Sequence, residues 1–205
     1  MHTKIRPYAL AMLVSTTAWT SANAVSISLT PTSVAATVGS SVLFDLKMDF
    51  SDDPTLGGGI DFFYNTNLLE FKSFVRSPTL GDDPGLRREP DVRQGIGLND
   101  LGFANFNGIA GPALVGQLTF KALAAGHAAI ALDANGGGPP DNLGPFLSAT
   151  PPSDPNAPPP IQNVTFTGAA IDISPSAVPL PGALPLMLSL GAGLAGFVRR
   201  RSTTV

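Results

Sequence analysis

Apolar and polar residues alternate one by one along VLFDLKMDF, residues 42–50, and this alternation limits the chain to β-structure. Successive side chains of a strand point to opposite faces of a sheet, whereas an amphipathic helix repeats its apolar positions every three or four residues. The segment is therefore predicted to be a strand with one face in a core. We expect Val42, Phe44, Leu46, Met48 and Phe50 on the core face, and Asp45, Lys47 and Asp49 in water.

Five other segments repeat the period of two: 25–30, 59–64, 114–123, 127–132 and 164–173. Their expected core residues are Val25, Ile27, Leu29, Ile60, Phe62, Tyr64, Leu118, Phe120, Ile130, Leu132, Val164, Phe166, Ile171 and Ile173. Between the two chain ends, no segment carries an apolar stripe of helical period and length. Consecutive strands joined by Gly, Pro and Asp turns predict an all-β antiparallel sandwich. Two turn-rich stretches, 77–94 and 136–160, are expected to be irregular.

The first 24 residues are typical of a secretory signal peptide. Lys4 and Arg6 precede a mostly apolar run, and Ala22 and Ala24 form an A-x-A cleavage site. Cleavage there gives a mature chain that begins at Val25. The sequence then divides into a signal peptide (1–24), a β-sandwich domain (25–174) and a C-terminal segment (175–205).

The C-terminal segment has the composition of a membrane anchor. It is free of charge from Ser174 to Val198 and ends in Arg199, Arg200 and Arg201. Its unbroken apolar part is shorter than the roughly 20 residues that span a bilayer comfortably, but a kinked transmembrane helix becomes long enough when the proline-rich part is included. The arginines predict a cytoplasmic C-terminus and an external domain.

Charge and composition exclude several classes of function. The part between the two ends carries 15 acidic and 7 basic residues, a net charge of −8, so it repels phosphate backbones and no nucleic-acid partner is expected. The chain has no cysteine, which excludes disulfides and thiolate chemistry. His127 is the only histidine left after export, and no G-x-S-x-G motif accompanies it. Carboxylate pairs such as Asp45/Asp49 or Asp52/Asp53 are interpreted as solvated residues, so no enzyme is predicted.

Calcium is the one cofactor that the acidic turns suggest, because oxygen ligands from loops suffice to bind it. Asp133, Asn135 and Asp141 begin like a D-x-N-x-G loop, but Gly144 stands where such a loop carries its glutamate. The acidic turns at 52–53 and 82–83 are alternative sites, and solvated turns without any ion are a further interpretation. We expect weak binding at best, with a dissociation constant of about 10⁻⁴–10⁻³ M.

Three hypotheses of function follow from these observations. The first is a non-enzymatic surface or matrix protein that interacts with exopolysaccharide, biofilm or another surface protein. The second is a carbohydrate-binding module. A flat aromatic platform is disfavoured, because it needs exposed rings and the mature chain has no Trp and one Tyr, which is expected in the core. A sugar site in a polar groove stays open. In this second case calcium would stabilise the module. The third is a secreted hydrolase, for which the catalytic groups are missing.

The strand segments resemble cohesin-like domains, which are jelly-roll sandwiches related to carbohydrate-binding modules. The resemblance lies in VGSSVLFDLKMDF (38–50), GGGIDFFYNTNLLEF (57–71) and ALVGQLTFKALAAGHAAIAL (113–132). It implies the fold, but it transfers no binding site, because the matching residues are core and turn positions. No dockerin partner is encoded in the chain.

The C-terminal segment resembles the PEP-CTERM sorting signal of bacteria that produce exopolysaccharide. Val178, Pro179, Leu180 and Pro181 match its VPLP variant, and an apolar run and the arginine cluster follow. The resemblance implies an exosortase-type processing enzyme, a transient anchor in the inner membrane, and then release to the cell surface or extracellular matrix. A plain C-terminal anchor is the alternative.

Overall fold

The computed structural model describes residues 25–135 and 143–177, which form twelve strands and one short 3₁₀ helix. The strands are β1 (Ser26–Thr30), β2 (Ser33–Thr37), β3 (Ser41–Asp49), β4 (Thr55–Tyr64), β5 (Leu69–Arg76), β6 (Asp91–Arg93), β7 (Gly97–Ile109), β8 (Ala113–Ala122), β9 (Gly126–Ala134), β10 (Leu147–Ser148), β11 (Thr165–Thr167) and β12 (Ala169–Ser174), and the 3₁₀ helix η1 is Pro84–Leu86. The expected signal peptide and sorting segment lie outside the described residues. Within the described ranges, no helix is long and apolar enough to cross a membrane.

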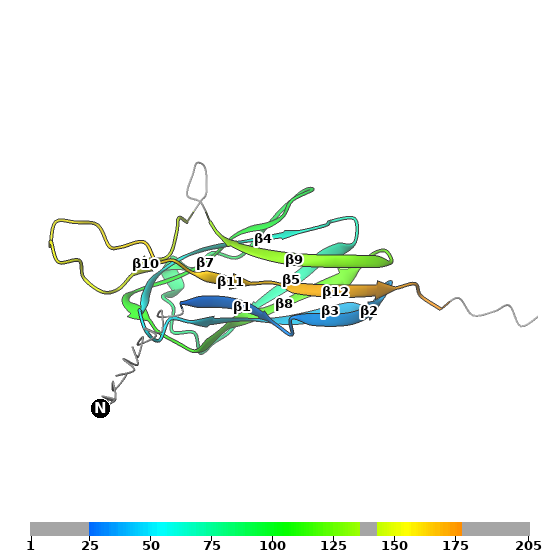
Figure 1. Ribbon diagram of the computed structural model, residues 1–205, viewed down its shortest axis with the longest axis horizontal. Coiled ribbons are helices and arrows are strands. Elements are labelled where there is room, and N and C mark those ends of the chain that lie inside the picture. The colour runs from blue at the N-terminus through cyan, green and yellow to red at the C-terminus, as the bar shows by residue number, and fades with distance from the viewer. Residues whose placement is uncertain (1–24, 136–142, 178–205) are drawn as a thin grey trace, which may run out of the picture.

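The strands form two sheets that pack face to face (Figure 1). One sheet has the order β11-β1-β3-β8-β5, and the other has the order β2-β12-β9-β4-β7-β6 with β10 beside β4. Neighbouring strands are antiparallel except in two pairs, β1 with β11 and β2 with β12. The predicted β-sandwich is therefore confirmed.

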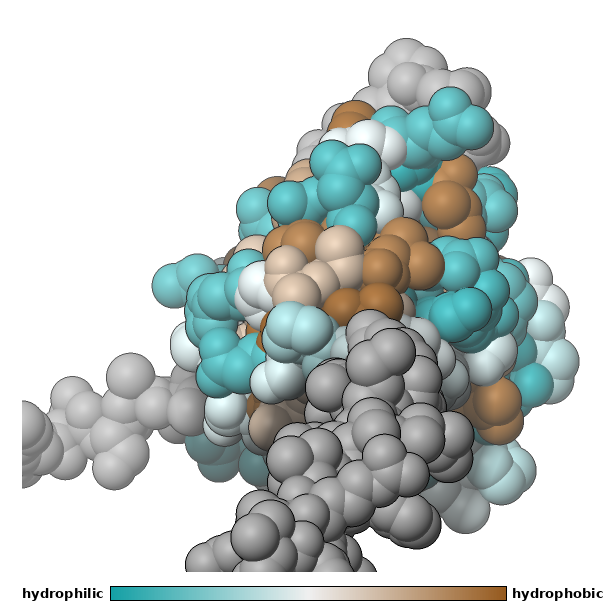
Figure 2. Space-filling view, turned by 90° about the vertical axis from the view of Figure 1, so that its right-hand side faces the viewer, coloured by the Kyte–Doolittle hydropathy of each residue, from teal (hydrophilic) through white to brown (hydrophobic). Residues whose placement is uncertain are grey.

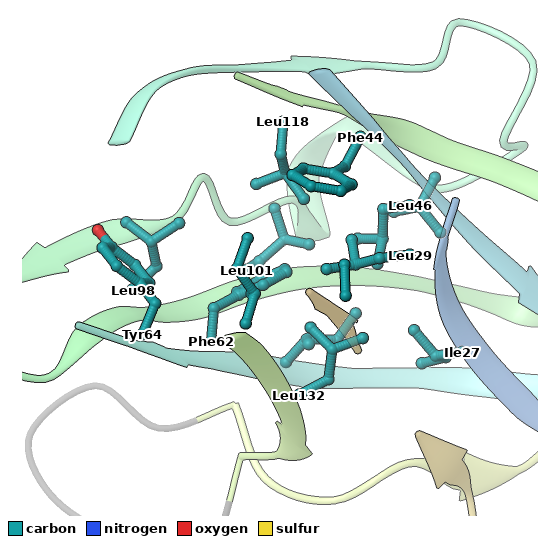
Figure 3. Close-up of a cluster of buried hydrophobic side chains, with 14 of the residues drawn as sticks. Ile27, Leu29, Phe44, Leu46, Phe62, Tyr64, Leu98, Leu101, Leu118 and Leu132 are labelled. Atoms are coloured by element: carbon teal, nitrogen blue, oxygen red, sulfur yellow. The ribbon is translucent and has the colours of Figure 1, made fainter. Parts of the chain in front are cut away.

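The core lies between the sheets and contains the side chains that the alternation assigned to it. Phe44, Leu46, Phe62 and Phe120 are fully buried. Figure 3 shows Phe44 and Leu118 from one sheet on one side of the cluster and Leu132 from the other sheet on the opposite side, with leucines packed between them. Phe120 is in edge-on contact with Phe44, Tyr64 and Phe71, at ring-centroid distances of 6.3, 5.1 and 5.8 Å. Of the expected core residues, Val164 and Phe166 are only partly buried, since β11 is the terminal strand of its sheet.

Strand β7 is the main element that the alternation does not predict. Residues 97–103 are buried on both faces of the sheet, so they carry no polar face to alternate with. Leu143 and Arg88 cover the outer face at Gly102, where an added Cβ would lie 2.0 Å from Leu143 Cδ1. A strand covered on both sides loses its period of two.

The described parts of the two turn-rich stretches are largely irregular, as expected, with η1, β6 and β10 as short exceptions.

Candidate functional site

A groove opens between β5 and β6, which are the terminal strands of the two sheets. Its volume is about 460 Å³, and its lining residues are Tyr64, Thr66, Leu69, Glu70, Phe71, Val92, Arg93, Gln94, Gly95 and Leu123. We call it the edge groove. Terminal strands present backbone N–H and C=O groups that another chain can pair with, so this groove lies where a sandwich is most open to a partner.

The edge groove is apolar but open to water. Val92 is 60% exposed and Leu123 is 39% exposed. Figure 2 faces the end of the sandwich that carries the β4–β5 and β8–β9 turns, and there apolar residues gather within a hydrophilic border. Exposed apolar surface with a polar rim is typical of interaction sites.

The floor and rim of the groove are chemically simple. Burial raises the pKa of the Tyr64 hydroxyl, and a hydrogen bond with the Phe71 backbone offsets only part of this rise. The floor of the groove therefore stays uncharged at neutral pH. Glu70 is the only carboxylate among the lining residues and forms an ion pair with Lys72 at 2.6 Å. Acid–base catalysis by two carboxylates needs a second acid beside the first. The groove is thus suited to binding rather than to acid–base chemistry.

A second groove, of about 490 Å³, combines polar side chains with the apolar Val25, Pro160 and Ile161, and its polar lining residues are Asp52, Asp53, Ser148, Thr150, Gln162 and Asn163. The Asp53 carboxylate accepts hydrogen bonds from Ser148 Oγ at 2.5 Å and Thr150 Oγ1 at 3.2 Å. Burial raises the pKa of Asp53, but hydrogen bonds from Ser148, Gln162 and Thr150 outweigh it and hold the pKa below the usual value. We call this site the polar groove.

The predicted calcium residues have different surroundings in the structure. Asp133 is exposed on β9, and its carboxylate accepts a hydrogen bond from the Ala134 backbone. Asn135 is buried and donates to Asp61 and Asp100 instead. Asp141, the sorting residues and the signal cleavage site lie outside the described residues.

Of the other candidate residues from the sequence, Asp52 and Asp53 line the polar groove. Asp82 is not in a solvated turn as interpreted, because it is buried in ion pairs with Arg76 and Arg87. His127 is exposed as expected and lies 2.7 Å from the Asp172 carboxylate. The pKa of Asp49 is lowered by hydrogen bonds from the Ser51 hydroxyl and backbone, which is the opposite of what a general acid requires.

The buried residues Asn99, Asp100 and Asn135 form a polar cluster with the half-buried Asp61 that the sequence did not predict. Pairing of β4 with β7 passes from Phe62–Leu98 to Ile60–Leu101, so Asn99 and Asp100 together face Asp61 across a β-bulge. Asp100 has a φ of +60°, a conformation that Asp tolerates better than most residues. The polar pair Asn99-Asp100 inside the apolar run 96–103 was the only sequence signal for it. Because Asp100 is 1% exposed, it cannot touch a substrate in this arrangement.

No protein-family model and no curated protein matches the chain. Solved structures of cohesin modules do share its fold. A chain of a type I cohesin–dockerin complex from Clostridium thermocellum has a TM-score of 0.55 at 12% identity, covering 76% of this chain and 96% of that one. The seventh ScaB type I cohesin from Pseudobacteroides cellulosolvens has a TM-score of 0.54 at 15% identity, covering 77% and 96%. The cohesin CaCohA2 from Clostridium acetobutylicum has a TM-score of 0.52 at 16% identity, covering 73% and 91%.

Proposed function

We propose that this protein is a non-enzymatic, exported interaction module whose edge groove binds a partner protein. The observation that carries the proposal is the groove itself, an apolar surface placed between two sheet edges. Side chains such as Val92 and Leu123 remain exposed although burial against a partner would remove their apolar area from water. A protein partner can supply both the apolar side chains and the backbone hydrogen bonds that such a site accepts.

The cohesin-like fold adds support for a protein partner. One of the similar structures is itself a cohesin–dockerin complex, so a sandwich of this architecture can serve as a protein-binding module. Sequence identities of 12–16% transfer neither the partner nor the binding residues. The partner of this chain is therefore proposed by its chemistry, as a protein segment with apolar side chains.

The proposed setting is the bacterial surface or the extracellular matrix. The A-x-A site at Ala22 and Ala24 supports export, and the order of Val178–Pro181, apolar run and arginine cluster supports processing by an exosortase-type enzyme. The chain would be held in the inner membrane until it is processed. A role in an exopolysaccharide matrix or biofilm follows from the kind of bacterium in which such signals occur.

Carbohydrate binding is a second candidate, favoured by the polar groove. Its carboxylate, hydroxyl and amide groups at Asp53, Thr150 and Gln162 are of the kinds that hydrogen-bond to sugar hydroxyls. The same groups already bond to one another, as Thr150 Oγ1 does to Asp53 Oδ1 and Gln162 Nε2 to the Asp53 carbonyl. A sugar would therefore have to compete with bonds inside the protein, which makes this site the weaker of the two.

Photo-crosslinking on the full chain in its native cells tests the proposal. A photoreactive residue at position 123 should form adducts with a protein, and L123D and V92D should abolish binding to that protein. Leu43 is the matched control, because it is 50% exposed on β3, which β8 separates from β5, and it does not line the groove. Adducts at position 43 but none at 123 would contradict the proposal. Binding of exopolysaccharide that is lost in D53N but kept in L123D would favour the second candidate.

A further inference from the structure

The polar cluster of Asp61, Asn99, Asp100 and Asn135 places two carboxylates side by side. Asp100 accepts a hydrogen bond from Asn99 Nδ2 at 2.6 Å and another from Asn135 Nδ2. The same Asn135 nitrogen lies 3.1 Å from Asp61 Oδ1. Because both carboxylates accept from one nitrogen atom, their oxygens lie close together, and their negative charges repel each other.

No cationic side chain of the described residues forms an ion pair with these carboxylates, and Arg93 and Arg88 act on Asp100 only at longer range. Among residues 25–135 and 143–177, five ion pairs are formed, and none of them includes Asp61 or Asp100. Burial raises the pKa of Asp100 and the charge of Asp61 raises it further. The hydrogen bond from Asn135 and the charges of Arg93 and Arg88 lower it only in part, so the pKa stays above its usual value. A buried carboxylate without a cation is costly to keep ionised.

Asn99 gives an independent indication of a missing ligand. The residue is only 6% exposed, and its Oδ1 atom is buried without a hydrogen-bond partner. Its Nδ2 atom donates a hydrogen bond to Asp100 Oδ2. Because Oδ1 belongs to the same planar amide group, it lies beside the cluster as well. A buried oxygen acceptor without a donor needs either a proton donor or a metal ion.

We propose that Asp61, Asn99 and Asp100 hold a divalent cation, with calcium as the preferred ion. Carboxylate and amide oxygens are the ligands that calcium takes, and its flexible coordination suits an irregular set drawn from two strands and a bulge. The ion neutralises the repulsion between the two aspartates and uses the lone pair of Asn99. It links β4 to β7 on the face of the sheet that is turned away from the core.

This site differs from the one that the sequence suggests. The predicted set was Asp133, Asn135 and Asp141, whereas the proposed ligands come from β4 and β7, with Asn135 as their neighbour. Asp133 lies directly opposite Asp61 on β9, so the two candidate sites are neighbours. Separate variants of Asp133 and Asp61 are needed to distinguish them. The site is independent of the edge groove, and a failure of the proposed function would leave it untouched.

Calorimetric titration of the full-length chain with CaCl₂, after removal of metals by a chelator, tests the proposal. We expect a dissociation constant of about 10⁻⁴–10⁻³ M, typical of extracellular modules. D100N and D61N should each weaken binding at least tenfold. D45N is the matched control, because Asp45 is a partly buried carboxylate that accepts from the Gln117 amide, and it lies on the other sheet. The affinity of D45N for calcium should stay within twofold of that of the wild type.

Three results would overturn the proposal. The first is no calcium-dependent heat and no rise in melting temperature up to about 10 mM, well above the expected dissociation constant. The second is wild-type affinity in D100N. The third is a tenfold loss in D133N together with wild-type affinity in D61N, which would move the ion to the predicted loop. A cooperative melt of each variant in chelator shows that the variant is folded.

Discussion

Asp82 and Asp100 both lose almost all contact with water, but their surroundings differ. Asp82 receives two guanidinium groups, with Arg76 Nη1 3.1 Å from Oδ2 and Arg87 Nη2 2.9 Å from Oδ1. Asp100 receives two amide groups and has a second carboxylate, Asp61, beside it. The chain therefore pairs the first charge with two guanidinium groups and leaves the second without an ion pair.

The contrast extends to what each cluster does in the fold. Arg76 ends β5 in one sheet and donates to the Gly102 carbonyl of β7 in the other, at 3.1 Å. It also donates to the Arg88 carbonyl at 2.7 Å, so the irregular segment after β5 is fixed against the sandwich. The Asp82 cluster is thus structural and complete within the chain. The Asp100 cluster, if it holds the proposed cation, would make the stability of the same domain depend on metal ions.

The largest effect is expected from removing Arg76. R76A leaves Asp82 buried with only the partly exposed Arg87 as a cation, and breaking a buried ion pair in this way costs about 3–5 kcal/mol. Urea unfolding of the full chain measures the free energy of unfolding. R87A is the control and should cost clearly less, since Arg76 then still pairs with Asp82. Equal losses in both variants would contradict the central role given to Arg76.

The fold was more predictable from the sequence than the two charge clusters. Phe44, Phe62 and Phe120 could be assigned to the core because each strand carrying them has one dry and one wet face. Strand β7 could not be assigned, since it is covered on both faces. Asp61 and Asp100 are 39 residues apart and meet only through a bulge in strand pairing, which no local pattern records. Arg76 and Asp82 are close in sequence, but their burial depends on how an irregular segment packs.

A second, smaller effect should come from D100N in the presence of chelator. The variant removes the buried charge, and rotation of the Asn99 amide lets its Oδ1 accept from the new side-chain nitrogen. The bond that Asn99 Nδ2 now donates is lost in that rotation, so the number of hydrogen bonds is unchanged. We expect the free energy of unfolding to rise by about 1 kcal/mol because the repulsion from the Asp61 charge is removed. In saturating calcium the order should reverse, with the wild type more stable. Loss of stability in chelator would mean that Asp100 is already fully compensated.

A third carboxylate, Asp53, allows the comparison to be sharpened by pH. Its lowered pKa means that it contributes stability above the ordinary aspartate pKa of 3.8, and that this stability is lost as the pH falls through the lowered value. S148A removes one hydroxyl donor, so the pKa should move back toward 3.8 and the loss of stability in acid should become shallower. The measurement is urea unfolding between about pH 2 and 7. If S148A loses stability in acid as steeply as the wild type does, neutral hydroxyls do not stabilise this carboxylate.

The smallest effect is expected at the exposed pair of His127 and Asp172. His127 Nδ1 lies 2.7 Å from Asp172 Oδ1, a distance as short as that of the buried Asp82 pairs, but the contact is in water. Both side chains are about two-thirds exposed, so solvent screens their attraction, and pairs of this kind contribute less than about 1 kcal/mol. D172N should therefore leave the urea midpoint at pH 7 unchanged within error. R76A also removes the contacts of Arg76 with Glu89 and with the Arg88 and Gly102 carbonyls, whereas D172N removes one exposed contact, so the difference between their effects measures what a buried network adds over a pair in water. A cost in D172N comparable to that in R76A would show that the contact distance, rather than the surroundings, decides what a charged pair is worth in this domain.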